Sequence, residues 1–153
     1  MDLTIAEEPF DSADARRLIA ELDAHLARFY PPEQRFGPNL KPEHLDGGRG
    51  VFLVARQDGR AVGCGAIRML DGAAAEAKRM YVDPALRGQG VGRAILEQLE
   101  AMARERGARS LVLETGVHQA PALALYRRAG FKEVDCWGEY ATSPSSICME
   151  KTL

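Results

Sequence analysis

The segment RGQGVG, residues Arg87–Gly92, places a glycine at every second position between a strand-like apolar run and an amphipathic helical pattern. Glycine tolerates positive φ and lets a ligand approach backbone N–H groups, so the chain can turn sharply at this point. The start of the following helix leaves N–H groups unpaired and carries a partial positive charge. The segment is therefore predicted to bind an anion, with a phosphate or pyrophosphate as the expected guest.

Composition narrows the class of protein to a small globular one. With 153 residues, 46% of them hydrophobic, the chain can bury one core, so residues 1–153 are predicted to form a single domain without repeats or linkers. The net charge of −2 provides no global basic field, which argues against nucleic acid and membrane surfaces as partners. The acidic N-terminal segment and the lack of a long apolar window predict a cytoplasmic location.

Three cysteines stand far apart in strand-like sequence without a CxxC motif: Cys64, Cys136 and Cys148. This pattern predicts reduced, buried thiols, with a disulfide between Cys136 and Cys148 as the alternative. Cys64 has no histidine or acid at a spacing that would activate it as a nucleophile. The histidines lack metal-ligand spacing, so no metal is predicted.

The first half of the chain is predicted to be mostly strands. Leu3–Glu7 reads as a strand, and a helix capped by Asp11 or Ser12 continues with apolar residues at helical spacing as far as Phe29. Two Asp-Gly dipeptides then separate apolar runs, which predicts an antiparallel meander. The strands of this meander are Val51–Gln57, Arg60–Leu70 and Ala74–Val82.

Between the first helix and the meander, Tyr30–Gly50 is rich in proline and glycine. Such a segment forms a long loop, with room for a short helix near Pro42–Leu45. A long loop at the edge of a domain is a candidate substrate lid, and a connection without a functional role is the alternative.

The second half alternates helices and strands. Apolar spacing predicts one helix from Val91 to about Gly107 and another over Ala122–Ala129 that ends at Gly130. The strands predicted here are Leu111–Leu113, Phe131–Cys136 and Ser146–Lys151. The whole pattern is that of a mixed α/β domain.

Three segments together, AEAKRMYVDPALRGQGVG, LETG and ALALYRRAGF, resemble the GNAT superfamily of N-acetyltransferases. Arg87, Gly90 and Gly92 match the core signature of that family, and the resemblance covers most of the chain. A dinucleotide-binding fold is a poor alternative, because its GxGxxG motif directly follows a strand, whereas here the spacing is GxGxG and five residues intervene. A Walker loop is excluded because no GK[ST] follows.

The resemblance implies a fold and a cosubstrate. The fold is α/β (α+β, GNAT-like): a mixed, mostly antiparallel sheet of about seven strands with helices on both faces, in which strands four and five splay apart to hold acetyl-CoA. The pyrophosphate would bind the N–H groups of the glycine segment. For Arg93, contact with the phosphates and a place on the solvated surface are equally expected. The residues that the resemblance places around acetyl-CoA are Met80, Tyr81, Val82, Arg87, Gly88, Gln89, Gly90, Val91, Gly92, Arg93, Gln119 and Tyr126.

Catalytic roles also follow from the resemblance. Tyr126 matches the general acid that protonates the departing thiolate, although its spacing also fits a core residue of the helix. Glu76 matches the general base that takes a proton from the amine, directly or through water, and an ordinary exposed glutamate is the alternative. Strand alternation predicts that Glu76, Lys78 and Met80 share one face of the sheet and Arg79 the other.

One position departs from the family. Where many members carry an asparagine that orients CoA, this chain has the segment GVHQAP, in which Gln119 is the nearest amide. Gln119 is therefore predicted to substitute for it, and a role as a helix cap is the alternative.

The predicted function is acetyl-CoA-dependent transfer of an acetyl group to a primary amine, directly in a ternary complex. A small molecule is the expected acceptor, with a peptide or protein amine as the alternative. A non-catalytic acetyl-CoA sensor is a further alternative. The resemblance also implies a homodimer as a common assembly state. The residues predicted to line the acceptor pocket, with packing at the edge of the domain as an equal alternative, are Tyr30, Glu33, Arg35, Phe36, Trp137, Glu139 and Tyr140.

Overall fold

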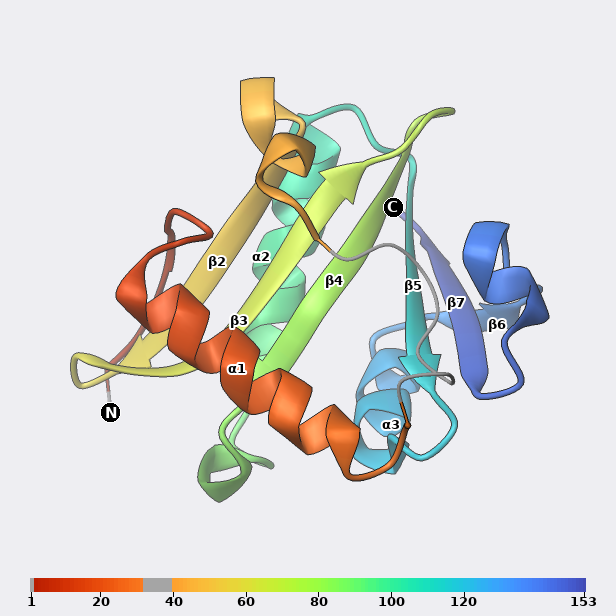
Figure 1. Ribbon diagram of the computed structural model, residues 1–153. Helices are drawn as coiled ribbons and strands as arrows, with labels where there is room; N and C mark the ends of the chain where they lie inside the picture. The colour runs from red at the N-terminus through yellow and green to blue at the C-terminus, as the bar shows by residue number, and fades with distance from the viewer. Residues whose placement is uncertain (1, 32–39) are drawn as a thin grey trace.

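The computed structural model describes residues 2–31 and 40–153, which form a seven-stranded sheet with the order β1-β2-β3-β4-β5-β7-β6 (Figure 1). All neighbouring strands are antiparallel except β4 and β5. The strands are β1 Leu3–Glu7, β2 Gly50–Gln57, β3 Arg60–Met69, β4 Ala74–Val82, β5 Ser110–Gly116, β6 Lys132–Val134 and β7 Ser146–Thr152. The helices are α1 Ala13–Ala27, α2 Val91–Glu105 and α3 Ala120–Arg128, and the short 3₁₀ turns are η2 Pro42–His44, η3 Asp46–Gly48, η4 Pro84–Leu86 and η5 Gly138–Thr142. None of the helices within the described ranges is long and apolar enough to cross a membrane.

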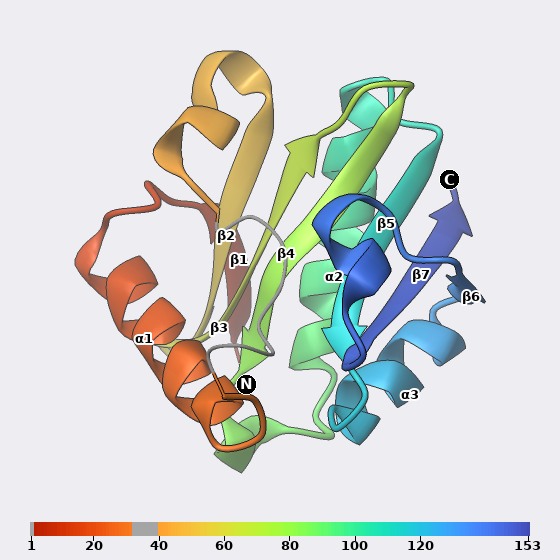
Figure 2. The same ribbon diagram turned by 45° about the vertical axis from the view of Figure 1, so that its right-hand side comes forward.

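Helices cover both faces of the sheet. α1 lies across one face, whereas α2 and α3 lie on the other (Figures 1 and 2). Alternation along β2 sends Leu53 to the α2 side, where it joins Ile95 and Leu99, and sends Phe52 to the α1 side, where it joins Leu18. The predicted mixed, mostly antiparallel sheet with helices on both faces is confirmed.

The meander turns as its Asp-Gly dipeptides predict. Between β2 and β3, Asp58 and Gly59 both adopt positive φ, of 51° and 85°. Successive positive φ values match the right-handed twist of a two-residue hairpin, which is why this dipeptide favours it. Ser12 accepts a hydrogen bond from Ala15 N–H and so caps α1, as its sequence position predicts.

The prediction of three reduced thiols is wrong for one pair. Cys136 and Cys148 form a disulfide with a Cα–Cα distance of 5.1 Å, because the antiparallel register of β6 and β7 places Val134 opposite Cys148 and so brings Cys136 near it. Cys64 is a free, buried cysteine. Burial raises the pKa of its thiol to about 12, which agrees with an unreactive core residue.

Candidate active site

The strands β4 and β5 part halfway along their length. Their paired residues run only from Ala74 opposite Ser110 to Ala77 opposite Leu113. Beyond this point the strands diverge toward the lower part of Figure 1, and the remaining residues of β4 have no partners on β5. Backbone groups at such an opening can hydrogen-bond an extended ligand that lies between the strands. The expected splay between strands four and five is therefore present.

A β-bulge changes the faces of β4 just after the splay begins. Arg79 has a positive φ of 57°, and the pairing with β3 shifts between Cys64 and Ala66. The bulge adds a residue to β4, so the simple alternation of side chains stops there.

The predicted sharing of faces is consequently wrong for Met80 and Arg79. Met80 packs with the core on the α2 side of the sheet. Arg79 reaches the α1 side, where its guanidinium pairs with Asp23 at 2.7 Å. Glu76 and Lys78 do share a face, since both approach the hydroxyl of Tyr140.

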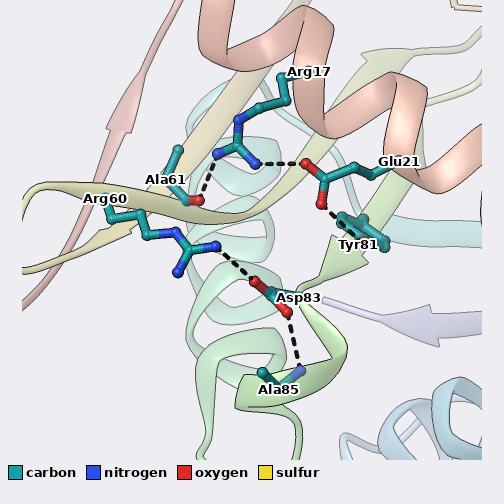
Figure 3. A network of polar contacts seen from close by, with 7 residues as sticks. All are labelled: Arg17, Glu21, Arg60, Ala61, Tyr81, Asp83 and Ala85. Carbon is teal, nitrogen blue, oxygen red and sulfur yellow. Dashed lines mark hydrogen bonds and ion pairs between the residues drawn. The ribbon is translucent and has the colours of Figure 1, made fainter.

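The other two residues of β4 predicted to line the cosubstrate site are Tyr81 and Val82. Tyr81 is buried on the α1 side, where its hydroxyl donates to Glu21 at 3.4 Å (Figure 3). Val82 packs against the core on the α2 side. Both side chains are thus engaged within the protein, and the backbone of these residues has no partner on β5.

The segment that leads from β4 into the glycine turn is fixed by Asp83. One oxygen of Asp83 accepts a hydrogen bond from Ala85 N–H at 3.0 Å, while the other pairs with Arg60 at 3.5 Å (Figure 3). The first of these bonds holds the η4 turn, and the chain emerges from it at Arg87.

The glycine turn has the conformation that its sequence predicts. Gly88 and Gly90 adopt left-handed φ values of 80° and 85°, and a Cβ at either would meet no described atom within 4 Å. Gly90 directly precedes Val91, the first residue of α2, and no side chain caps that helix start. Gly92 instead packs closely, because a Cβ there would lie 3.2 Å from Leu125. The exposed turn therefore presents uncapped N–H groups to solvent.

The polar side chains of the turn differ in what they contact. Arg87 and Gln89 are exposed, and Arg87 makes no ion pair within the described residues. Arg93 pairs with Glu97 at 3.0 Å on the surface of α2. Arg87 is therefore the freer of the two arginines to meet an anion.

The ring of Tyr126, on α3, lies in the core, whereas its hydroxyl has no hydrogen-bond partner among the described residues. Its side chain is 5% exposed and packs edge-on against Phe131, with ring centroids 5.8 Å apart. Its hydroxyl makes no hydrogen bond to any described residue. Burial, and secondly the nearby charge of Glu114, raise the pKa of the phenol, so that it keeps its proton at neutral pH.

Gln119 lies directly before α3 with its side-chain nitrogen buried. That Nε2 has no partner among the described groups, and the side chain makes no capping hydrogen bond. A buried donor without a partner costs about 1–3 kcal/mol, so a ligand that accepts from it would recover this free energy. The geometry thus agrees with the predicted ligand contact better than with a side-chain cap.

Glu76 lies in the α1 face of β4 and is only 1% exposed, so the alternative of an ordinary exposed glutamate is wrong. Its carboxylate accepts from Arg68 Nε at 2.8 Å and from the Tyr140 hydroxyl at 3.0 Å. Lys78 Nζ lies 3.7 Å away and donates to the same Tyr140 hydroxyl at 3.0 Å. All three contacts hold the charged carboxylate in place.

Glu114 is a candidate that sequence reasoning missed. It is the first residue of β5 past the paired segment, and Ser146 donates a hydrogen bond to it at 2.5 Å. Burial raises the pKa of this carboxyl group, although the bond from Ser146 and the charge of Lys78 oppose the shift. An acid directly after a buried apolar strand, in LETG, was the available signal.

The end of α1 reaches across to the loop that follows β5. The hydroxyl of Tyr30 accepts from His118 N–H at 2.9 Å, and the Tyr30 ring fits against Gly116, where a Cβ would clash with it. In the segment between β6 and β7, Trp137 packs edge-on against Tyr140, with ring centroids 5.5 Å apart. Of the remaining predicted pocket residues, Glu139 lies in η5, whereas Glu33, Arg35 and Phe36 lie outside the described residues.

Comparison with known proteins identifies the class. Residues 16–131 match the acetyltransferase (GNAT) family, and the chain belongs to that family. An IAA acetyltransferase from Azospirillum brasilense is 44% identical over 99% of both chains. The chain is accordingly an N-acetyltransferase.

Solved structures agree on the fold. A putative acyl-CoA N-acyltransferase from Klebsiella pneumoniae shares 38% identity over 99% of this chain and 97% of its own, with a TM-score of 0.84. PaiA N-acetyltransferase from Thermoplasma acidophilum, solved in complex with coenzyme A, has a TM-score of 0.75 at 19% identity over the whole of both chains. The second likeness shows a shared fold alone.

Proposed function

We propose that this N-acetyltransferase moves the acetyl group of acetyl-CoA directly to the primary amine of a small molecule, in a ternary complex. The observation that carries the proposal is the splay of β4 and β5. Two polar groups of the α3 region have no partner among the described residues, the Tyr126 hydroxyl and the Gln119 Nε2. Both can serve a ligand that enters the splay. The name of the Azospirillum relative supports a small-molecule acceptor.

The residues present fit acetyl-CoA, which supplies the activated acyl group. The N–H groups of the turn and of the α2 start, with Arg87 beside them, suit a pyrophosphate. The backbone of Met80–Val82 offers hydrogen bonds to an extended chain and to a polarised carbonyl. Gln119 Nε2, which is buried without a partner among the described groups, can donate to the same ligand.

Two proton transfers remain for side chains. Tyr126 holds its proton because burial raises its pKa, so it can deliver that proton to a departing sulfur. The predicted base, Glu76, would have to give up its ion pair with Arg68 to accept a proton. We therefore assign proton acceptance from the amine to Glu114, whose pKa is raised toward the working range, and a positioning role to Glu76.

The experiment that tests this function measures release of free thiol from acetyl-CoA with a panel of primary amines. Amine-dependent release, with acetylated amine in equal amount by mass spectrometry, is expected. Tight binding of CoA without transfer to any amine, small or peptidic, would instead indicate a sensor.

The variant Glu114→Gln tests whether Glu114 or Glu76 accepts the proton of the amine. The variant is expected to lose about 10²-fold or more in kcat and to lose the acidic limb of the pH profile, since a glutamine cannot accept the proton. That limb should lie above 4.5, the ordinary pKa of a glutamate, because burial raises the value at this site. A Glu114→Gln enzyme with wild-type kcat at every pH would return the role to Glu76 or to water.

The cytoplasmic location and the homodimer stay predictions.

A further inference from the structure

Two positive side chains share one carboxylate on the α1 face of β4. Glu76 pairs with Arg68 at 2.8 Å and lies 3.7 Å from Lys78. The side chains of Arg68 and Lys78 are only 19% and 11% exposed, so both charges are largely removed from water. Withdrawing a charge from water is costly unless an opposite charge compensates it, and Glu76 is the one described carboxylate that lies within ion-pair distance of these two cations.

Hydrogen-bond donors of both cations remain available. Arg68 uses its Nε toward Glu76, while its two terminal nitrogens donate to no described residue. Lys78 makes one hydrogen bond, to Tyr140, although an ammonium group has three donors. The free fork of a guanidinium next to an ammonium suits a carboxylate, which can accept two hydrogen bonds at once.

The other neighbouring carboxylates form no ion pair with Arg68 or Lys78 among the described residues. Asp23 is engaged by Arg79, and Glu114 on β5 accepts from Ser146. Burial lowers the pKa of Lys78, whereas the charges of Glu76 and Glu114 act to raise it. Burial, followed by the positive charge of Arg68, lowers the pKa of His44, which agrees with a positive potential on this side of the sheet.

The pair lies where an acceptor must approach. Lys78 is the first residue of β4 after the pairing with β5 stops, and Glu114 is the first such residue of β5. Tyr140 reaches the pair from η5, which lies on the same side of the sheet as α1 (Figure 2). A molecule at this position would thus have a proton acceptor on one strand and a cationic pair on the other.

We infer that the acceptor carries a carboxylate close to its amine, as an amino acid does, and that Lys78 and Arg68 bind this carboxylate while the amine lies beside Glu114. The inference rests on the proposed function and specifies its substrate class. The carboxylate accepts hydrogen bonds from the unused donors of both cations, and Glu114 faces the amine. Glu76 and Tyr140 hold the two cations in a fixed geometry.

The test compares amines that differ only in the carboxylate. Thiol release from acetyl-CoA is measured with phenylalanine against 2-phenylethylamine, tryptophan against tryptamine, and methionine against 3-(methylthio)propylamine. A hydrogen-bonded charge pair in a desolvated site is worth a factor of about ten to a hundred, so kcat/KM should favour the amino acid by at least about tenfold in the pairs that are turned over.

A pair of variants locates the effect. Lys78→Met removes the charge but keeps an unbranched side chain, and it should reduce the preference for the amino acid at least about tenfold, mainly through KM. Lys78→Arg should retain the preference. Lys132→Met, on an exposed residue of β6, is the matched control and should change neither the preference nor the melting temperature.

The outcomes are distinct. Equal or better use of the decarboxylated amines by the wild-type protein would overturn the inference while leaving the acetyltransferase function intact. A Lys78→Met enzyme that folds and keeps the wild-type preference would also overturn it. If the Lys78→Met variant does not fold, the kcat/KM preference of the wild-type protein for amino acids over the decarboxylated amines alone supports or overturns the inference. Failure of every amine tested to stimulate thiol release would refute the proposed function, and the inference with it.

Discussion

Removal of one oxygen atom tests the role of Tyr126. In Tyr126→Phe the ring stays in the core, where it is 5% exposed, and only the hydroxyl is lost. Because that hydroxyl bonds to no described residue, its loss breaks no hydrogen bond within that part of the fold, and the free energy of unfolding should change by less than about 1 kcal/mol. A general acid contributes roughly 10²–10⁴-fold to rate, which corresponds to about 3–5 kcal/mol of transition-state stabilisation.

The assay measures kcat and KM by thiol release, CoA affinity by calorimetry and stability by urea unfolding. We expect kcat to fall by about 10²-fold or more, with nearly unchanged CoA affinity and stability. Since burial raises the pKa of this phenol, the wild-type enzyme should show no alkaline loss of activity from Tyr126 up to at least its ordinary value of 10.0. Full turnover in the variant across pH, with unchanged CoA affinity, would refute the assignment.

Three further predictions concern the glycine turn, the buried carboxylate and the disulfide. Gly90→Val should weaken CoA binding at least about tenfold, whereas Gly59→Val, at a hairpin glycine with the same φ of 85°, should pay a similar backbone cost of about 1–2 kcal/mol without affecting CoA; equal CoA affinity in both variants would contradict the anion site. Glu76→Gln should destabilise the fold by about 3–5 kcal/mol, because its buried cationic partners lose their compensation, whereas Glu97→Gln, in an exposed pair, should cost less than about 1 kcal/mol in urea unfolding. Cys136→Ser opens a loop with a sequence separation of 12 and should cost about 3 kcal/mol, and thiol titration of the unfolded, unreduced wild-type protein should find one free thiol, not three.

Local chemistry explains which parts of the fold could be predicted from the sequence. The Asp-Gly hairpin and the glycine turn each require positive φ, and glycine provides it at little cost, so the residue types reveal the backbone. The helices and most strands follow from apolar spacing. Gly88 and Gly90 fall in the left-handed region that the predicted turn needs.

The remaining features depend on contacts between distant residues. Arg79 adopts a positive φ although it is not a glycine, so the bulge that redirects Met80 left no sign in the sequence. Glu76 meets Tyr140 across 64 residues, and only the packing of η5 against β4 reveals that its carboxylate is engaged. The pairing of the cysteines likewise depends on the register of β6 and β7, which composition does not specify.

A crystal structure with acetyl-CoA would show where the cosubstrate binds. The pyrophosphate is expected on the N–H groups of Arg87–Gly92, the pantetheine between β4 and β5, and the thioester sulfur within reach of the Tyr126 hydroxyl. A cosubstrate bound outside the splay would contradict the proposed acetyl-CoA site, and a sulfur remote from Tyr126 would contradict its role as general acid.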